Sequence, residues 1–157
     1  MKNFQNKAKI VKVSKVIRHI LFAGLVVWIG VGIPIVLLQA VNLWNKIGNS
    51  ATLYLQGGGI LLLVLSFIVN LKLFRFFDRL KQGFLFDAQT VGHLDDAGKW
   101  WLLLWLFEVV YYEIGHGVFH VSNAWNSGGL FAGLALIFVA WLLKEAQGLQ
   151  EEQELTV

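Results

Sequence analysis

Three side chains near the end of an aromatic-rich stretch have a spacing that could hold a metal ion or a cofactor. Glu113, His116 and His120 follow the pattern E-x-x-H-x-x-x-H. On an α-helix these offsets place the three side chains within about 60° of one another, so all three could face one point. Imidazole and carboxylate groups suit zinc, iron or copper, and a histidine can also hold a haem or a chlorin.

The same three residues also have a plainer interpretation. Gly115 and Gly117 weaken the helix that the spacing needs. A single helix supplies at most three ligands, and no other residue expected near this end of the helix is an evident fourth ligand. The Glu-His group would then consist of polar residues at a helix end, which is the interpretation that the sequence favours.

A further acid, Glu108, lies about 12 Å along the same expected helix from Trp100, close to the middle of a bilayer. An ionised carboxylate at that depth costs several kcal/mol unless it is paired, and no lysine or arginine lies there. We therefore expect a neutral Glu108 in a hydrogen-bonded polar cluster, and a proton relay is the functional alternative. The expected neighbours in the cluster are Gln56, Tyr111 and Tyr112.

Four apolar stretches would have to position these groups. Each is near the 20 helical residues that cross a hydrocarbon core of about 30 Å. Hydrophobic residues make up 57% of the chain and charged residues 15%, which is too apolar for a soluble globule of 157 residues. We predict one domain, an all-α integral membrane bundle of four transmembrane helices with amphipathic cytoplasmic segments, and a kink at Pro34. The predicted spans are about 18–41, 51–72, 99–120 and 125–147.

The basic residues indicate how this bundle is oriented. Twelve of the thirteen lysines and arginines lie before the apolar run 20–38, between the runs 51–71 and 100–120, or after the run 128–143, and Lys46 is the exception. Because positive side chains stay on the cytoplasmic side during insertion, both termini and the loop 73–98 are predicted to be cytoplasmic. Anionic lipid headgroups explain the net charge of +3 better than nucleic acid does, so no direct nucleic-acid binding is expected.

The loop 73–98 has an apolar stripe at helical spacing with basic residues on its other side. The stripe consists of Leu73, Phe76, Phe77 and Leu80. Gly83 should end this amphipathic helix at the headgroups, and Asp87 should cap a second short helix. The loop is either a lipid-lying connector that sets the spacing of the spans or a platform for a cytoplasmic partner, with Arg75 and Arg79 as candidate contacts.

The C-terminal tail, residues 149–157, has the opposite charge. Glu151, Glu152 and Glu154 follow a membrane surface that favours positive charge. The tail is therefore expected to stay away from lipid, either as a solvated chain end or as a contact for a basic protein surface.

Three adjacent glycines, 57–59, lie inside the second span. Glycines in such a position usually permit close packing of membrane helices. Together with the abundant aromatic residues they make a homo-oligomer a candidate assembly, although no residue specifies its order.

Two stretches resemble a known bacterial family, the domain of unknown function 2975. One is the segment 73–98, with its aromatic and basic run, Gly83, Phe86 and Gly98; the other is the ending QEEQELTV. The resemblance implies a small multi-pass protein of the bacterial cytoplasmic (inner) membrane. Relatives are often encoded beside a small helix-turn-helix regulator, and the family supplies no established catalytic residues.

The sequence contains no hydrolase motif and no phosphate-binding loop, and it has no cysteine for a thiolate site. We therefore expect a non-enzymatic regulatory or scaffold protein that holds a cytoplasmic partner, for example a helix-turn-helix regulator, through its middle loop and acidic tail. The alternative is an accessory subunit of a larger membrane complex that binds a metal, haem or pigment through the Glu-His group.

Overall fold

The computed structural model describes residues 2–45, 50–84, 87–119 and 128–155, and within them the regular structure is entirely helical. Four helical stretches are long and apolar enough to cross a membrane. This confirms the prediction of an all-α membrane protein with four transmembrane helices. The elements in chain order are α1 (Lys2–Val27), η1 (Trp28–Gly32), α2 (Ile33–Asn45), α3 (Ser50–Lys81), α4 (Ala88–Phe119) and α5 (Gly128–Leu155).

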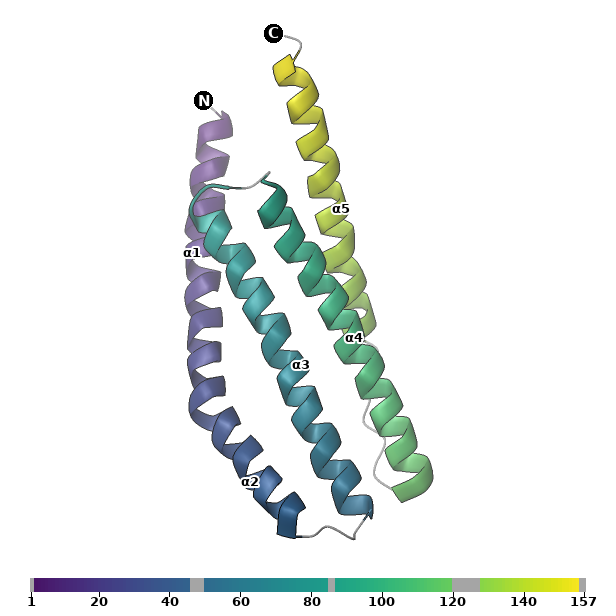
Figure 1. Cartoon of the computed structure of the whole chain (residues 1–157). Coiled ribbons are helices and arrows are strands. Elements are labelled where there is room, and N and C mark those ends of the chain that lie inside the picture. Colours follow the sequence, from purple (N-terminus) through teal and green to yellow (C-terminus); the bar gives the residue numbers. More distant parts are fainter. Residues whose placement is uncertain (1, 46–49, 85–86, 120–127, 156–157) are drawn as a thin grey trace.

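The first membrane-spanning stretch bends where the sequence places its proline. Pro34 has no backbone N–H, and its ring would clash with the carbonyl of residue 30 in a straight α-helix. The chain accommodates this with the single π-helical segment η1 just before the proline, and α2 then continues in a new direction (Figure 1). The predicted kink is confirmed, and it lies slightly closer to the N-terminus than Pro34 itself.

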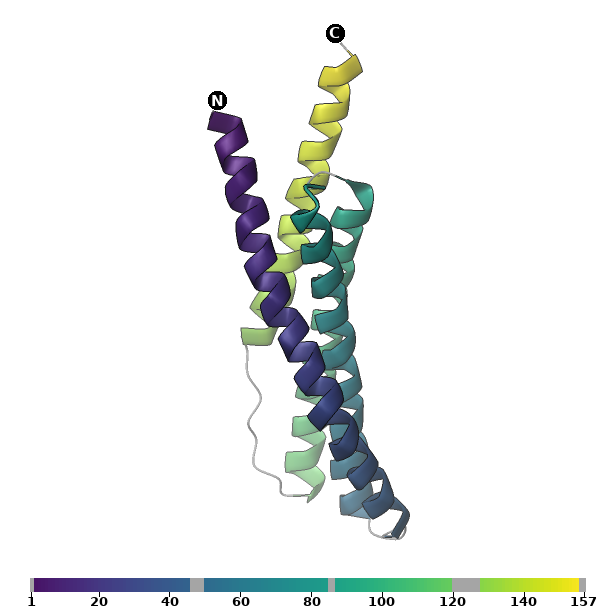
Figure 2. The same ribbon diagram turned by 90° about the vertical axis from the view of Figure 1, so that its left-hand side faces the viewer.

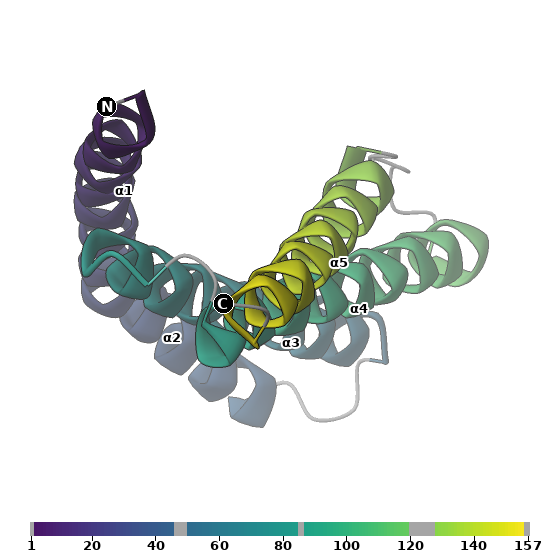
Figure 3. The same ribbon diagram turned by 90° about the horizontal axis from the view of Figure 1, so that it is seen from above.

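The helices pack side by side in chain order. α1 and α2 contact α3, α3 contacts α4, and α4 contacts α5. Seen from above, they form a curved row with α1 and α5 at its two ends (Figure 3). Large apolar side chains remain exposed on the first and the last membrane-spanning stretch, for example Leu38 of α2, which is 66% exposed, and Phe131 of α5, which is 68% exposed. Such faces suit the lipid of a bilayer, and the chain is accordingly a multi-pass membrane protein.

Both termini and the turn between α3 and α4 lie at one end of the molecule, which we call the termini end (Figures 1 and 2). The opposite end, where α2 and α4 finish and α3 begins, is called the far end. An even number of spans returns the chain to its starting side, so this arrangement agrees with the predicted topology.

The predicted loop 73–98 is mostly helix. α3 continues to Lys81 and α4 starts at Ala88, so only a short turn lies between them. Gly83 has a positive φ of 89°, a conformation that glycine adopts at little cost, and this confirms that it ends the first helix. The two predicted amphipathic segments are therefore direct extensions of the second and third spans.

The apolar stripe on the extension of α3 is buried against protein. Phe76 and Leu80 form one core cluster with Val91 and Leu94 of α4 and with Ala140 of α5. The interpretation of this segment as a connector lying on lipid headgroups is therefore wrong. Because α3 continues without a break, its stripe stays in line with α4 and α5, and burial there removes it from both water and lipid.

α5 starts beside the middle of α4. A Cβ atom on Gly129 would lie 2.7 Å from the Trp105 indole, and one on Gly98 would lie 2.6 Å from Ile137. These two contacts place the N-terminal end of α5 partway along α4, as Figure 2 also shows. The other end of α5 consequently extends past the turn between α3 and α4.

Candidate functional site

The Glu-His group falls only partly within the described residues. α4 runs through Gly115 and Gly117 to Phe119, so the helix that the spacing needs is formed up to that residue. Glu113 and His116 are exposed near the far end, whereas His120 lies outside the described residues. Within the ranges that the structure describes, no three His, Asp or Glu side chains are grouped to hold a metal ion. A metal, haem or chlorin site with all three residues stays a prediction.

Glu108 is partly exposed on α4, and no described residue forms a hydrogen bond or an ion pair with it. The amide oxygen of Gln56, on α3, is buried and has no partner among the described residues. The side chain of Tyr111 turns instead to α3, where its hydroxyl donates a hydrogen bond of 3.0 Å to the carbonyl of Leu55, while its ring meets that of Tyr112 edge-on. The structure therefore does not join Glu108 to the three neighbours expected for it.

A residue that sequence reasoning missed completes this contact. The hydroxyl of Tyr54 donates a hydrogen bond to the carbonyl of Tyr111, so each tyrosine bonds the backbone of the opposite helix. The two rings stack with their centroids 5.0 Å apart, and Phe119 lies 4.8 Å from Tyr54. Tyr54 lies only two residues before Gln56 and so points to the other side of α3, and no local signal in the sequence singles it out, because the contact depends on how α3 and α4 align.

Ion pairs gather at the termini end and link neighbouring helices. Arg18 of α1 pairs with Asp78 of α3 at 2.5 Å, and Lys72 of α3 pairs with Asp96 of α4 at 2.5 Å. All four side chains are partly exposed, so each pair contributes at most about 1 kcal/mol. Their main effect is geometric, because they hold α1, α3 and α4 in one register beyond the apolar spans.

Arg79 was a candidate contact for a partner, but its side chain binds other residues of the α3–α4 turn. It forms an ion pair with Asp87, and its guanidinium carbon lies 5.0 Å from the centre of the Phe84 ring. The hydrogen bond from Arg79 also holds the pKa of the Asp87 carboxyl below its ordinary value. Asp87 accepts hydrogen bonds from backbone N–H groups at the start of α4 as well, which confirms it as the predicted N-cap. Arg75, by contrast, is exposed.

The acidic tail is helical. α5 continues to Leu155, so Glu152 is held, exposed, on a helix that extends past the turn between α3 and α4 (Figure 1). The side chains of Glu151 and Glu154 lie outside the described residues, although their backbone belongs to the same helix. The N-terminal part of α1 projects at this end too, and it carries the exposed residues Lys9, Lys12 and Lys15.

The termini end thus carries a basic helix and an acidic helix on the two sides of the α3–α4 turn, with Phe84 48% exposed on the turn itself. Ordered helices, charges of both signs and an exposed aromatic ring are features of a surface that binds another protein. We call these exposed groups, namely Arg75, Phe84 and Glu152, the docking surface.

The model of a family described as a protein of unknown function (DUF2975) matches residues 50–157. The matched range begins at the first residue of α3 and includes α3, α4, α5 and the docking surface. No curated protein and no solved structure matches the chain.

Proposed function

This chain belongs to the DUF2975 family of proteins of unknown function, and we propose that it acts in the bacterial inner membrane as a non-enzymatic regulatory or scaffold protein. In this proposal the termini end faces the cytoplasm, where the docking surface holds a soluble partner. The distribution of lysine and arginine supports the orientation, because twelve of these thirteen residues belong to segments on that side.

The single observation that carries the docking role is the ordered extension of the helices beyond the apolar spans. Segments that only connect membrane helices need no such extension, whereas here α3 and α4 continue together and bury an apolar core of their own. The buried cluster and the ion pairs described above link the helices of this extension to one another. A rigid surface loses less entropy when a partner binds to it, which favours affinity.

The charge of α5 indicates what kind of partner would fit. Glu152 is exposed on α5, and the tail around it is acidic in sequence; because the membrane surface attracts positive charge, we expect this tail to stay away from lipid and to attract a basic protein. Helix-turn-helix regulators carry basic surfaces because they bind phosphates. A regulator of this class, held at the membrane by the acidic helix, is the partner that we propose.

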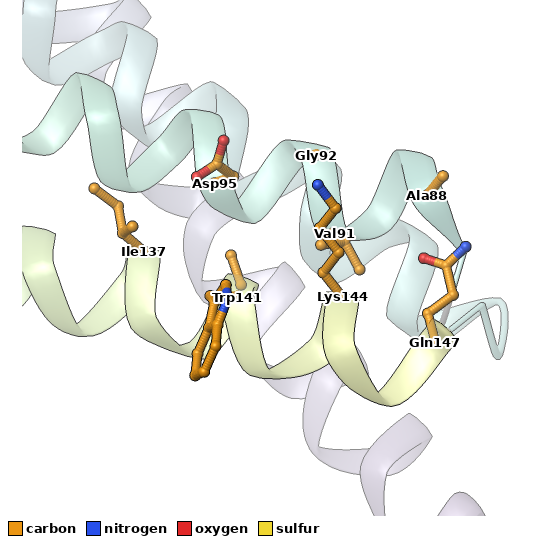
Figure 4. Close-up of a pocket in the computed structure, with 9 residues that line it drawn as sticks. Ala88, Val91, Gly92, Asp95, Ile137, Trp141, Lys144 and Gln147 are labelled. Atoms are coloured by element: carbon orange, nitrogen blue, oxygen red, sulfur yellow. The ribbon is translucent and has the colours of Figure 1, made fainter. Parts of the chain in front are cut away.

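Removal of residues 150–157 tests this proposal. α4 begins at Ala88 opposite Gln147, so the deleted residues extend past α4 and their loss should leave the spans intact (Figure 4). We expect a soluble basic protein to be isolated with the intact chain from gently solubilised native membranes, and to be lost, by about tenfold or more, from the shortened chain.

The matched control is His116→Ala, which changes a side chain at the far end and should retain the partner. The charge reversal Glu152→Lys should weaken binding in the same direction as the deletion. The docking role is contradicted if the same proteins are isolated in the same amounts with the intact chain, the shortened chain and both single variants.

A further inference from the structure

A cavity of about 350 Å³ lies between α4 and α5 near the termini end. Figure 4 shows that Val91, Gly92 and Asp95 line it from α4, while Ile137, Trp141 and Lys144 line it from α5. The gap exists because Gly92 has no side chain, and no atom lies within 4 Å of the place that its Cβ would take. The volume falls within the range of small-molecule sites, which starts at about 300 Å³.

The cavity lies at the level of the lipid headgroups. Lys144 is the first charged residue after the apolar stretch 128–143, and Asp95 precedes the apolar stretch that starts at Trp100. Asp95 lies five positions before Trp100 on the helix, which corresponds to about 7.5 Å along the axis. The headgroup layer on each side of a bilayer is of the same thickness, about 5–8 Å.

Opposite charges face the cavity from its two walls. Lys144 is exposed and extends from α5 toward Gly92, and Asp95 lies about one turn further along α4 (Figure 4). One carboxylate oxygen of Asp95 accepts a hydrogen bond from Lys99, four residues later on the same exposed helix face. Such a surface pair contributes only about 0.3–0.5 kcal/mol, so it competes weakly with a ligand for the carboxylate.

Apart from Gln147, the remaining lining is apolar and open to lipid. Ile137 and Trp141 belong to α5, and Trp141 is 55% exposed. A tryptophan at the boundary between apolar and charged residues is typical of the membrane interface. The cavity therefore combines a cation, an anion and an apolar wall at the depth where a phospholipid carries its phosphate, its headgroup and the start of its acyl chains.

We propose that this cavity binds a phospholipid whose headgroup carries both a phosphate and a primary ammonium, as phosphatidylethanolamine does. Lys144 binds the phosphate, Asp95 accepts hydrogen bonds from the ammonium, and the apolar wall contacts the upper acyl chain. A glycerol headgroup brings no cation to Asp95, and a choline headgroup has no N–H to donate. The site does not depend on the docking role, since none of the exposed groups of the docking surface lines it.

Lipid retention by the purified full-length chain tests the proposal. The protein is exchanged into mixed micelles with phosphatidylethanolamine, phosphatidylcholine or phosphatidylglycerol of identical acyl chains, and the lipids that remain bound are counted by native mass spectrometry. We expect phosphatidylethanolamine to be retained about tenfold better than phosphatidylcholine, the factor that one charge-assisted hydrogen bond supplies.

Three variants separate the parts of the site. Gly92→Leu fills the cavity and should abolish selective retention, whereas Gly148→Leu, where no atom lies within 4 Å of the new Cβ, should not. Lys144→Gln should weaken binding of phosphatidylethanolamine and phosphatidylglycerol alike, and Asp95→Asn should remove the preference between them. Equal retention of all three lipids, or selectivity that survives Gly92→Leu, would overturn the proposal. A preference for phosphatidylglycerol that Asp95→Asn leaves unchanged would overturn it as well.

Discussion

Replacing Gly98 with leucine is expected to force α4 and α5 apart and to destabilise the protein by about 3 kcal/mol. A Cβ at this position would lie 2.6 Å from the Ile137 side chain and 3.0 Å from the Ile137 backbone nitrogen. The backbone atom cannot move aside without a shift of the whole helix, so the clash cannot be relieved by a change of rotamer. Thermal unfolding of the purified protein in lipid discs, followed by its helical circular dichroism, measures the loss.

Gly117→Leu is the matched control, because it places the same side chain on the same helix where no atom lies within 4 Å of the new Cβ. Its unfolding temperature should stay close to that of the unchanged protein. If both variants unfold at the same temperature, close packing at Gly98 is not what holds α5 against α4.

Gly58→Ala should have the second-largest effect, a loss of about 1–3 kcal/mol from a single methyl group. The new Cβ would overlap the ring of Tyr111. That ring is held in place by its hydrogen bond to the Leu55 carbonyl and by stacking on Tyr54, so it cannot turn away without losing both contacts. The measurement is the same thermal unfolding in lipid discs.

The adjacent residue supplies the control for this prediction. Gly57 has no atom within 4 Å of its would-be Cβ, so Gly57→Ala should be neutral or slightly stabilising. The double variant Gly58→Ala with Tyr111→Leu should be less destabilised than the sum of the two single changes, because the smaller side chain removes the overlap. If the destabilisations of the two single variants simply add in the double variant, the methyl group of Gly58→Ala does not act through the ring of Tyr111.

These two predictions mark where sequence reasoning reached its limit. The presence of four long apolar helices, the bend near Pro34, the break at Gly83 and the cap at Asp87 depend on local properties of the chain, and all were predictable from it. Which of the glycines 57–59 lies against another helix depends on the register between α3 and α4. The pattern of hydrophobic residues in the two helices does not determine this register, so the sequence alone cannot distinguish the three glycines.

The candidate docking residues show the same limit. Arg75 and Arg79 are both basic and lie one turn apart, so the sequence alone cannot distinguish them. Only the fold of the turn brings Asp87 and Phe84 beside Arg79 and leaves Arg75 exposed.

The cavity between α4 and α5 could not be predicted from the sequence either, because its two charged residues are 49 positions apart in the chain. What reveals the cavity is the position of Gly92 opposite α5, and only the three-dimensional structure shows this position.

The docking role depends on one claim, that the termini end faces the cytoplasm. The chain contains no cysteine, so a single introduced thiol can be labelled without background. Gln82→Cys places the thiol on the exposed α3–α4 turn, and Asn123→Cys places it between the third and fourth spans in the sequence. A membrane-impermeant maleimide is then added to spheroplasts and to inside-out membrane vesicles. We predict that Asn123→Cys is labelled in spheroplasts and Gln82→Cys only in inside-out vesicles; labelling of Gln82→Cys from outside the cell would contradict the claim.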